Sequence, residues 1–282
     1  MSVTPPLSAP GTTWTVRDPR ELALRIRLRA VRMVARHGLG YLGQALSSAE
    51  QVAAVFASAV PGRDQLACSP GHYVIGPFAA AAELGLITEA DIGTYGDDGS
   101  VVEAIGTERS PVFDYTCGSL GQGLSAAAGL ALAGRLRGEA SARVFAMISD
   151  GELEEGQVWE AAMFAAHHRL DRLTVLLDAN NSQVDGPVDT ITTIEPVAAK
   201  WEAFGWHAAD VDGHDAQAIM SALARAGSRT DRPGVVICRT STRHGLDCLP
   251  PDADGHFIKL PPDLADAATR ELTGKLERLA NA

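Results

Sequence analysis

Two polar clusters follow apolar, strand-like segments in this sequence, and their residue types are those that bind hard cations. The run Val144–Ser149 ends at Asp150-Gly151, and a later apolar run ends in Asn180. Asp150 and Asn180 stand thirty positions apart, the length of one strand-helix-strand unit. A carboxylate, an amide oxygen and a nearby main-chain carbonyl, completed by phosphate oxygens and water, make an octahedral shell for Mg²⁺ or Ca²⁺. The spacing therefore predicts a metal site.

Gly151 adds a second feature to this site. A glycine lets the chain turn and lets an anionic group approach the backbone, and the helix expected after it offers free N–H groups to anionic oxygen. The metal would offset repulsion between Asp150 and phosphate. A strand that ends in Asp-Gly is, by itself, typical of an ordinary turn. The joint spacing of Asp150 and Asn180 is what favours a functional site.

Short, almost continuously apolar strands alternate with helical segments along the chain. Strands are expected at residues 113–116, 142–150, 173–180, 206–213 and 234–241, and helices between them at 155–170, 194–205 and 215–227. This alternation predicts an α/β fold, a doubly wound and mostly parallel sheet with helices on both faces. Ligands bind beyond the carboxyl ends of the strands in such sheets, where both clusters fall.

The ends of the chain differ from its centre. We expect residues 1–18 to form a flexible tail, residues 19–262 to form the binding domain and residues 263–282 to form a C-terminal helix. The arginines between Arg25 and Arg36 alternate with apolar residues at helical spacing. They predict an amphipathic helix with a solvated basic face.

Charge and cysteine usage limit the possible partners and compartment. A net charge of −11 and a pI near 5.1 argue against nucleic acid or an anionic membrane as a partner. The four cysteines form no Cys-x-x-Cys pair, which favours a reducing compartment. No signal-like apolar stretch or membrane-length run is seen, so a cytoplasmic protein is expected.

Other conspicuous residues have structural interpretations. Trp159 and Phe164, on the helix after the first cluster, are expected in the core. Asp210, Asp212 and His214 follow a strand into a turn, and we expect no metal there.

Three segments carry a family resemblance. "SDGELEEGQVWEAA" followed by "LLDANNSQVDG" resembles the thiamine diphosphate motif of transketolases, Gly-Asp-Gly followed about thirty residues later by Asn. "TCGSLGQGLSAAAGLAL" is similar to the family's "TGSLGQGLS" segment and "CSPGHYVIGPFAAAAELG" to its "S-x-GH" segment. The resemblance runs from about residue 20 to 260 and covers the amino-terminal, diphosphate-binding half of a transketolase. It implies thiamine diphosphate and Mg²⁺, or alternatively Ca²⁺, as cofactors.

The resemblance assigns roles to the polar clusters. Asp150 and Asn180 would bind the metal, with the Ser182 carbonyl as a third ligand, and Gly151 would approach the diphosphate. The residues implied against the thiazolium and aminopyrimidine are Gly118, Leu120 and Gly121.

The resemblance also implies three catalytic residues. His72 matches the cofactor-contacting histidine of the "GH" segment, and His256 resembles a late histidine near the diphosphate. Glu155 falls at the interface glutamate of the family.

This sequence departs from the family pattern at three places. Ser149 replaces the first glycine of Gly-Asp-Gly, whose role is mainly steric. Tyr41 stands where a substrate-contacting histidine is found, and the "GHPE" segment is missing near Ala104. Histidines that would hold sugar hydroxyls or assist proton transfer are thus absent. Cofactor binding is expected to be retained, with an altered substrate.

The resemblance also implies a partner. The glutamate that activates the cofactor and the arginines that hold a sugar phosphate belong to a pyrimidine-binding domain in this family. We expect a separately encoded subunit to supply that domain in an α₂β₂ assembly acting on small molecules.

Three functions remain open at this stage. The first is the amino-terminal subunit of a split transketolase, transferring a two-carbon ketol unit from a ketose or ketose phosphate. The second is a pathway-specific enzyme that transfers or condenses an acyl or ketol unit onto a non-sugar or carrier-bound acceptor. The third is a non-catalytic binding subunit.

Overall fold

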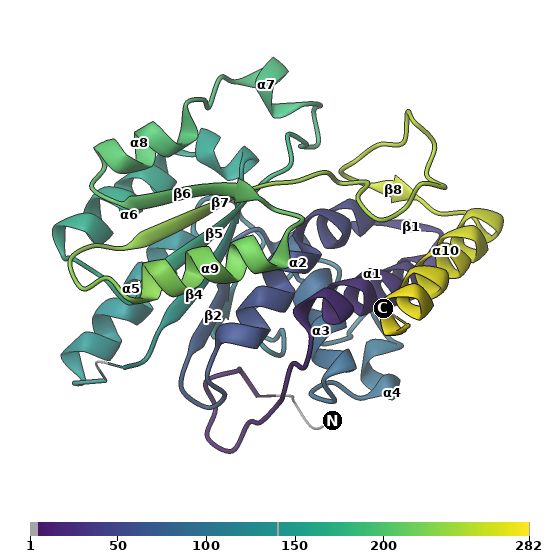
Figure 1. Cartoon of the computed structure of the whole chain (residues 1–282), viewed down its shortest axis with the longest axis horizontal. Coiled ribbons are helices and arrows are strands. Elements are labelled where there is room, and N and C mark those ends of the chain that lie inside the picture. The colour runs from purple at the N-terminus through teal and green to yellow at the C-terminus, as the bar shows by residue number, and fades with distance from the viewer. Residues whose placement is uncertain (1–4, 140, 282) are drawn as a thin grey trace.

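Six parallel strands form the central sheet of the computed structural model, which describes residues 5–139 and 141–281 (Figure 1). The strand order is β3-β2-β4-β5-β7-β6, and each neighbouring pair is parallel. The strands are β2 (Gln65–Cys68), β3 (Tyr115–Thr116), β4 (Val144–Ser149), β5 (Leu173–Ala179), β6 (His207–Asp212) and β7 (Gly234–Arg239). A separate antiparallel pair joins β1 (Leu39–Gly40) to β8 (Ile258–Lys259).

Helices cover both faces of the sheet, which confirms the predicted α/β class. The first face carries α2 (Leu42–Ser58), α3 (Ile75–Glu83) and α9 (Ala216–Gly227), with α1 (Pro19–Ala35) and α10 (Pro262–Ala280) packed outside them. The second face carries α5 (Gly123–Leu136), α6 (Gly156–His167) and α8 (Val197–Ala203). Shorter helices are η1 (Gly71–Tyr73), α4 (Glu89–Ile92), η2 (Gly151–Glu154) and α7 (Val188–Ile191).

Alternation within the buried strands builds two cores. In β4, Phe145 and Met147 pack toward the first face, whereas Ala146 and Ile148 pack toward the second. Successive side chains of a strand point to opposite faces, so a strand covered on both sides must be apolar throughout. This is why β4, β5 and β7 were recognisable as continuous apolar runs, whereas β6, none of whose residues is fully buried, was not.

Residues 5–18 differ from the expected flexible tail. Pro6 pairs with Val112, and the Leu7 N–H donates to the Val112 carbonyl at 3.0 Å. Leu7 is buried, and the Trp14 indole N–H donates to the Phe56 carbonyl. The apolar side chains of this segment fix it on the domain, and residues 1–4 lie outside the described residues.

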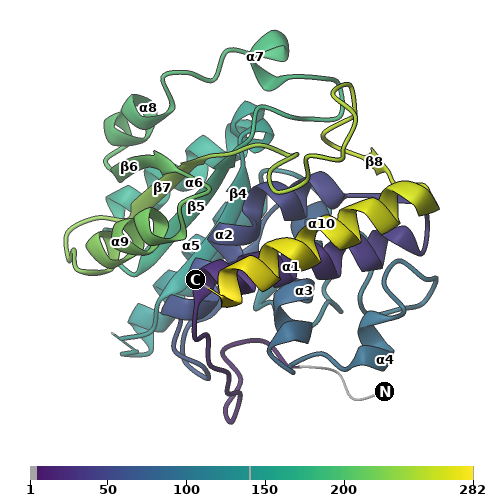
Figure 2. The same ribbon diagram turned by 45° about the vertical axis from the view of Figure 1, so that its right-hand side comes forward.

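The expected solvated basic face of α1 is also wrong at one position. Figure 2 shows α10 lying along α1, so α1 is enclosed between α10 and the inner helices. Arg27 is only 1% exposed and forms an ion pair with Glu50 of α2. Within the described residues, no helix is long and apolar enough to cross a membrane.

Candidate functional site

The carboxyl edge of β4 and β5 brings the two polar clusters together. Ser149 pairs with Asp178 in the parallel register, so Asp150 follows β4 beside the end of β5. The Asp150 carboxylate accepts hydrogen bonds from the Asn181 N–H at 2.6 Å and the Gly151 N–H at 2.9 Å. Asn181 adopts a left-handed backbone conformation with φ of 56°, which turns the chain back toward Asp150.

Asp150 is a buried carboxylate without a cationic partner. It is 2% exposed, and in residues 5–139 and 141–281 no lysine or arginine pairs with it. Burial, and then the negative charge of Asp178, raise the pKa of Asp150 to about 7. A bound cation would reverse this effect by stabilising the charged form.

Asn180 and Ser182 complete an all-oxygen donor set beside Asp150. The Asn180 Oδ1 accepts a hydrogen bond from the Ser182 N–H at 2.9 Å and keeps a second lone pair. Over the described part of the chain, no group donates a hydrogen bond to the Ser182 carbonyl oxygen. A carboxylate, an amide oxygen and a free carbonyl suit Mg²⁺, so these residues fit the predicted metal.

Gly151 and Gly121 have different reasons for being glycine. A Cβ atom at Gly151 would meet only the Gln183 Cβ, at an ordinary 3.6 Å, so this chain leaves the space above Gly151 open to a ligand. Gly121 has φ of +78°, and its Cβ would lie 2.8 Å from the Glu155 Cβ. The backbone conformation of its loop therefore requires glycine there.

A buried glutamate that the sequence did not single out holds this loop. The Glu152 carboxylate accepts hydrogen bonds from the Gly121 N–H at 2.7 Å, the Ser149 N–H at 3.1 Å and the Ser69 hydroxyl. Burial raises the pKa of Glu152 to about 7. Gly118 and Leu120 lie exposed on the loop that Glu152 anchors. In the sequence, the only signal for Glu152 was its position three residues after Ser149.

The two predicted histidines lie together although 184 positions apart in sequence. The ring centroids of His72 and His256 are 4.9 Å apart, and Tyr41 contacts both rings. Burial, and then the neighbouring His256, lower the pKa of His72 to about 3. Burial also lowers the pKa of His256. Both imidazoles are therefore neutral near pH 7, each able to donate one hydrogen bond and accept another.

Glu155 lies apart from the histidine pair. It is exposed at the start of α6, beside Gly121. The structure thus separates the predicted site residues into an edge with the candidate metal ligands, an aromatic group around His72 and an outward-facing loop with Glu155.

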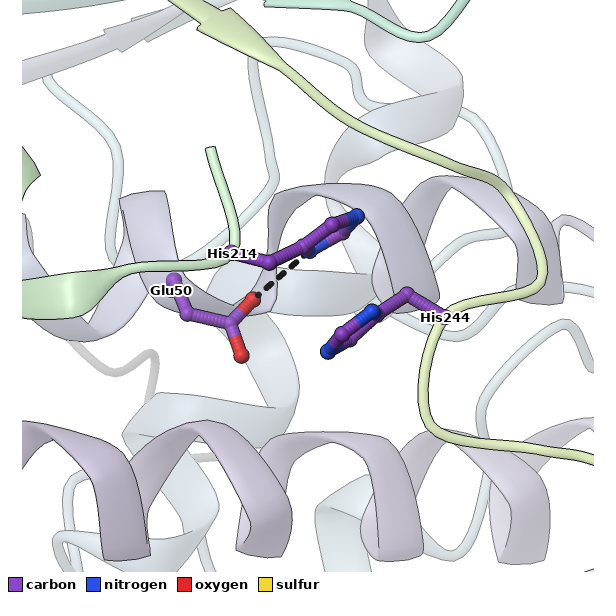
Figure 3. A group of neighbouring side chains, drawn as sticks. All are labelled: Glu50, His214 and His244. Atoms are coloured by element: carbon purple, nitrogen blue, oxygen red, sulfur yellow. Dashed lines mark hydrogen bonds and ion pairs between the residues drawn. The ribbon is translucent and has the colours of Figure 1, made fainter. Parts of the chain in front are cut away.

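A second cluster of possible metal ligands contains Glu50, His214 and His244 (Figure 3). Their ligand atoms lie within 4.8 Å of one another. The His214 Nε2 accepts a hydrogen bond from the Ser241 N–H at 2.9 Å, so its proton is on Nδ1, the atom that faces Glu50. A metal needs the lone pair at that atom, and Glu50 is already paired with Arg27. We therefore assign no metal to this cluster.

The residues around this cluster form a separate feature of the surface. A cavity of about 1160 Å³ lies beside it, lined by α1, the start of α9 and residues 241–247, and not by Asp150. Asp210 and Asp212 neighbour His214 in sequence, but their carboxylates do not join the cluster. Asp210 forms an ion pair with Arg239, and Asp212 accepts a hydrogen bond from the backbone N–H of His214. The expectation of a simple turn there fits this geometry.

Comparisons with known proteins place the sequence in one family. Residues 19–257 match the family described as transketolase, thiamine diphosphate binding domain. A putative uncharacterized transketolase family protein, y4mO of Sinorhizobium fredii, is 38% identical over 86% of this chain and 90% of its own length. The 6-deoxy-6-sulfo-D-fructose transketolase subunit SqwG of a Clostridium species is 35% identical over 90% of this chain and 96% of its own length.

Longer relatives match over less than half of their length. Human transketolase-like protein 2 is 33% identical over 95% of this chain but only 44% of its own. The transketolase structure from Campylobacter jejuni has a TM-score of 0.81 at 23% identity, covering 92% of this chain and 43% of that one. This last likeness supports the fold.

Proposed function

This chain belongs to the transketolase family, and on that premise we propose that it is the diphosphate-binding subunit of a two-component enzyme. The enzyme uses thiamine diphosphate and Mg²⁺ to transfer a two-carbon ketol unit from a ketose or ketose phosphate to an acceptor. One observation carries the proposal: the cation-free carboxylate of Asp150 lies beside Asn180 and the free Ser182 carbonyl at the edge where such sheets bind ligands.

Each group at this edge has a role in the proposal. Asp150, Asn180 and Ser182 would hold Mg²⁺, and the diphosphate would pass over Gly151, where space is open. The bound cofactor supplies an electron sink for carbanion chemistry. His72 and His256, neutral and partly buried, would contact the bound cofactor, because a neutral imidazole can both donate and accept a hydrogen bond.

A separately encoded pyrimidine-binding subunit would complete the site. Support comes from the two relatives of similar length, of which SqwG is named a subunit. It also comes from three large apolar side chains on α5 and α6: Leu136, Met163 and Phe164 are 79%, 52% and 41% exposed. Exposed apolar groups on neighbouring helices are typical of protein interfaces. We propose an α₂β₂ assembly in which this surface and Glu155 face the partner.

One departure from the family favours a second candidate function. Tyr41 occupies the place of a substrate-contacting histidine and packs against His72, His256 and Phe257. An aromatic ring offers less to sugar hydroxyls than an imidazole does, which suits transfer to a non-sugar or carrier-bound acceptor. The third hypothesis, a non-catalytic subunit, gives no reason for keeping a complete metal-binding set.

Titration calorimetry with thiamine diphosphate and Mg²⁺ tests the proposal. The titration is run on this chain alone and on the chain co-purified with its candidate partner. Tight binding only by the pair is the expected result. If neither preparation binds the cofactor, the non-catalytic subunit becomes the favoured function.

Asp150→Ala provides the decisive variant. Without that carboxylate, Mg²⁺-dependent cofactor binding by the complex should be lost, while the circular dichroism spectrum and Tm should show a folded protein. Removing a buried charge without a partner is not expected to unfold the domain. Cofactor affinity equal to the wild type would remove the metal assignment.

A further inference from the structure

Asp178 is a buried carboxylate that none of the assigned roles uses. It lies near the end of β5, two residues before Asn180, and is 1% exposed. Over residues 5–139 and 141–281, no arginine, lysine or histidine pairs with it. A carboxylate this buried must be stabilised by hydrogen bonds or by a cation nearby.

Five hydrogen-bond donors converge on the Asp178 carboxylate. Oδ1 accepts from Gln51 and Thr240 at 2.7 and 2.6 Å, and Oδ2 accepts from Ser47, Tyr73 and Asn180 at 2.6, 2.9 and 2.7 Å. With all its lone-pair directions in use, Asp178 cannot also be a metal ligand.

The same hydrogen bonds determine which way the Asn180 amide faces. Its Nδ2 donates to the Asp178 Oδ2 at 2.7 Å and to the Tyr73 hydroxyl at 2.8 Å. If the amide were turned over, its oxygen would face the Asp178 carboxylate, and the hydrogen bond to Asp178 would be lost. The Oδ1 is therefore held on the opposite side, toward Ser182 and the metal-binding edge.

Asp178 lies directly behind the candidate metal ligands. Asp150 follows β4, Asp178 lies near the end of the neighbouring β5, and both carboxyl groups are buried. Over residues 5–139 and 141–281, no lysine or arginine pairs with either one. Asp178 contacts Asn180 without occupying a coordination position, as outer groups of metal sites commonly do.

We infer that Asp178 is a positioning residue for the metal: through its hydrogen bond with Asn180 it holds the Asn180 oxygen toward the cation. The inference rests on the proposed function, in which a divalent cation binds at Asp150 and Asn180. It also gives a reason why Ser47 and Gln51 of α2 and Tyr73 of η1 are buried polar residues.

The test uses Mn²⁺ in place of Mg²⁺, because free Mn²⁺ is measured directly by electron paramagnetic resonance. Thiamine diphosphate and Mn²⁺ are titrated into the complex of this chain with its partner, in wild-type and Asp178→Asn forms. We expect the variant to bind Mn²⁺ at least about tenfold more weakly, the range found when outer groups of metal sites are changed. An affinity within about threefold of the wild type would overturn the inference.

Two further variants separate positioning from general stability. Asp64 is a fully buried carboxylate at the opposite edge of the sheet, paired with Arg63 and Arg143. Asp64→Asn should lower Tm without weakening Mn²⁺ binding. If Asp64→Asn and Asp178→Asn lose Mn²⁺ affinity in proportion to their loss of Tm, Asp178 is only structural and the inference is wrong.

Tyr73→Phe covers the case in which Asp178→Asn does not fold. It keeps the ring and removes one hydrogen bond each from Asp178 and Asn180. A Mn²⁺ affinity lower by about threefold or more supports positioning, and wild-type affinity contradicts it. Failure of the wild-type complex to bind Mn²⁺ would instead refute the proposed function, so the two failures are distinguishable.

Discussion

At the scale of single residues, we propose that Tyr41 takes part in selecting the substrate. Its ring lies 5.2 Å from His72 and 5.0 Å from Phe257, centroid to centroid. Tyr41→His would introduce a group that both donates and accepts hydrogen bonds near the substrate hydroxyls. Because one such bond contributes about 0.5–1.5 kcal/mol, we expect kcat/KM for a phosphorylated ketose to rise by up to about tenfold. Steady-state kinetics of the complex would measure it.

Tyr41→Phe is the matched control for that substitution. It keeps the aromatic ring and removes only the hydroxyl, so it should bring no gain with the same ketose. A Tyr41→His complex with activity at or below the wild type would show that Tyr41 does not cause the altered specificity.

Glu50 gives a prediction about pH at the same scale. Burial alone would raise its pKa, but the charge of Arg27 and a hydrogen bond from His214 lower the pKa to about 2, and His244 faces the same carboxylate. A depressed pKa means that the stabilisation is fully present above about pH 4.5 and is lost as pH falls toward 2. Glu50→Gln should cost about 3–5 kcal/mol at pH 7, because Arg27 stays buried without its partner.

Urea unfolding of the wild type and Glu50→Gln at pH 7, 5 and 3 measures this effect. The difference in unfolding free energy should be constant between pH 7 and 5 and should shrink at pH 3. A difference that stays constant down to pH 3 would mean that Glu50 titrates normally in the folded protein.

Only some site residues could be predicted one at a time from the sequence. Asp150 and Asn180 each follow an apolar strand, so their shared edge can be inferred from strand order. Asp178 stands in the same segment, but its donors include Ser47 and Thr240, which are 131 and 62 positions away. Hydrogen bonds between such distant segments leave no pattern in the sequence.

At the scale of elements, two of the three glycines of α5 have opposite surroundings. A Cβ atom at Gly123 would lie 2.4 Å from the Ser69 Cα, whereas one at Gly129 would meet nothing within 4 Å. Gly123→Ala must push α5 away from the loop after β2 and should destabilise the domain by about 1–3 kcal/mol. Gly129→Ala adds only helix propensity and should stabilise it by about 0.5–1 kcal/mol.

Chemical denaturation of the two alanine variants of α5 compares them directly. The helix and the substitution are the same, so any difference comes from the contact with Ser69. Equal unfolding free energies for the two variants would contradict the close approach of α5 to that loop.

Elements with strong apolar patterns were predictable, and those held by distant contacts were not. The strands at the centre of the sheet and the helices between them match the sequence expectations closely. Residues 87–110 gave no expectation, since their polarity is mixed. In the structure this segment contains the short α4, and a hydrogen bond from the Gly106 N–H to the Gly71 carbonyl ties its end to η1. This segment is thus held by a contact between residues far apart in the sequence, and such a contact leaves no periodic pattern in the local sequence.

At the scale of the whole molecule, the sequence could not separate the core from surfaces that another chain would cover. Phe164 was expected in the core, and the structure leaves it 41% exposed next to Met163. Burial in a core and burial in an interface require the same apolar side chains. The pattern of α6 alone therefore cannot distinguish them, and the fold of this chain shows only that Phe164 lies outside its core.

The exposed apolar surface of α5 and α6 gives the last prediction. Met163 is 52% exposed on α6, which begins directly after Glu155. If this surface binds the partner subunit, Met163→Glu would bury an unpaired charge on assembly, at a cost of several kcal/mol. The isolated chain should keep its Tm, because the substituted side chain is exposed there.

Val60, 40% exposed in the turn after α2, provides the control: Val60→Glu should leave assembly unchanged. Light scattering after size-exclusion chromatography would measure both. Assembly by the Met163 variant at wild-type affinity would exclude this part of α6 from the partner interface and leave Leu136 of α5 and Glu155 as the groups proposed to face it.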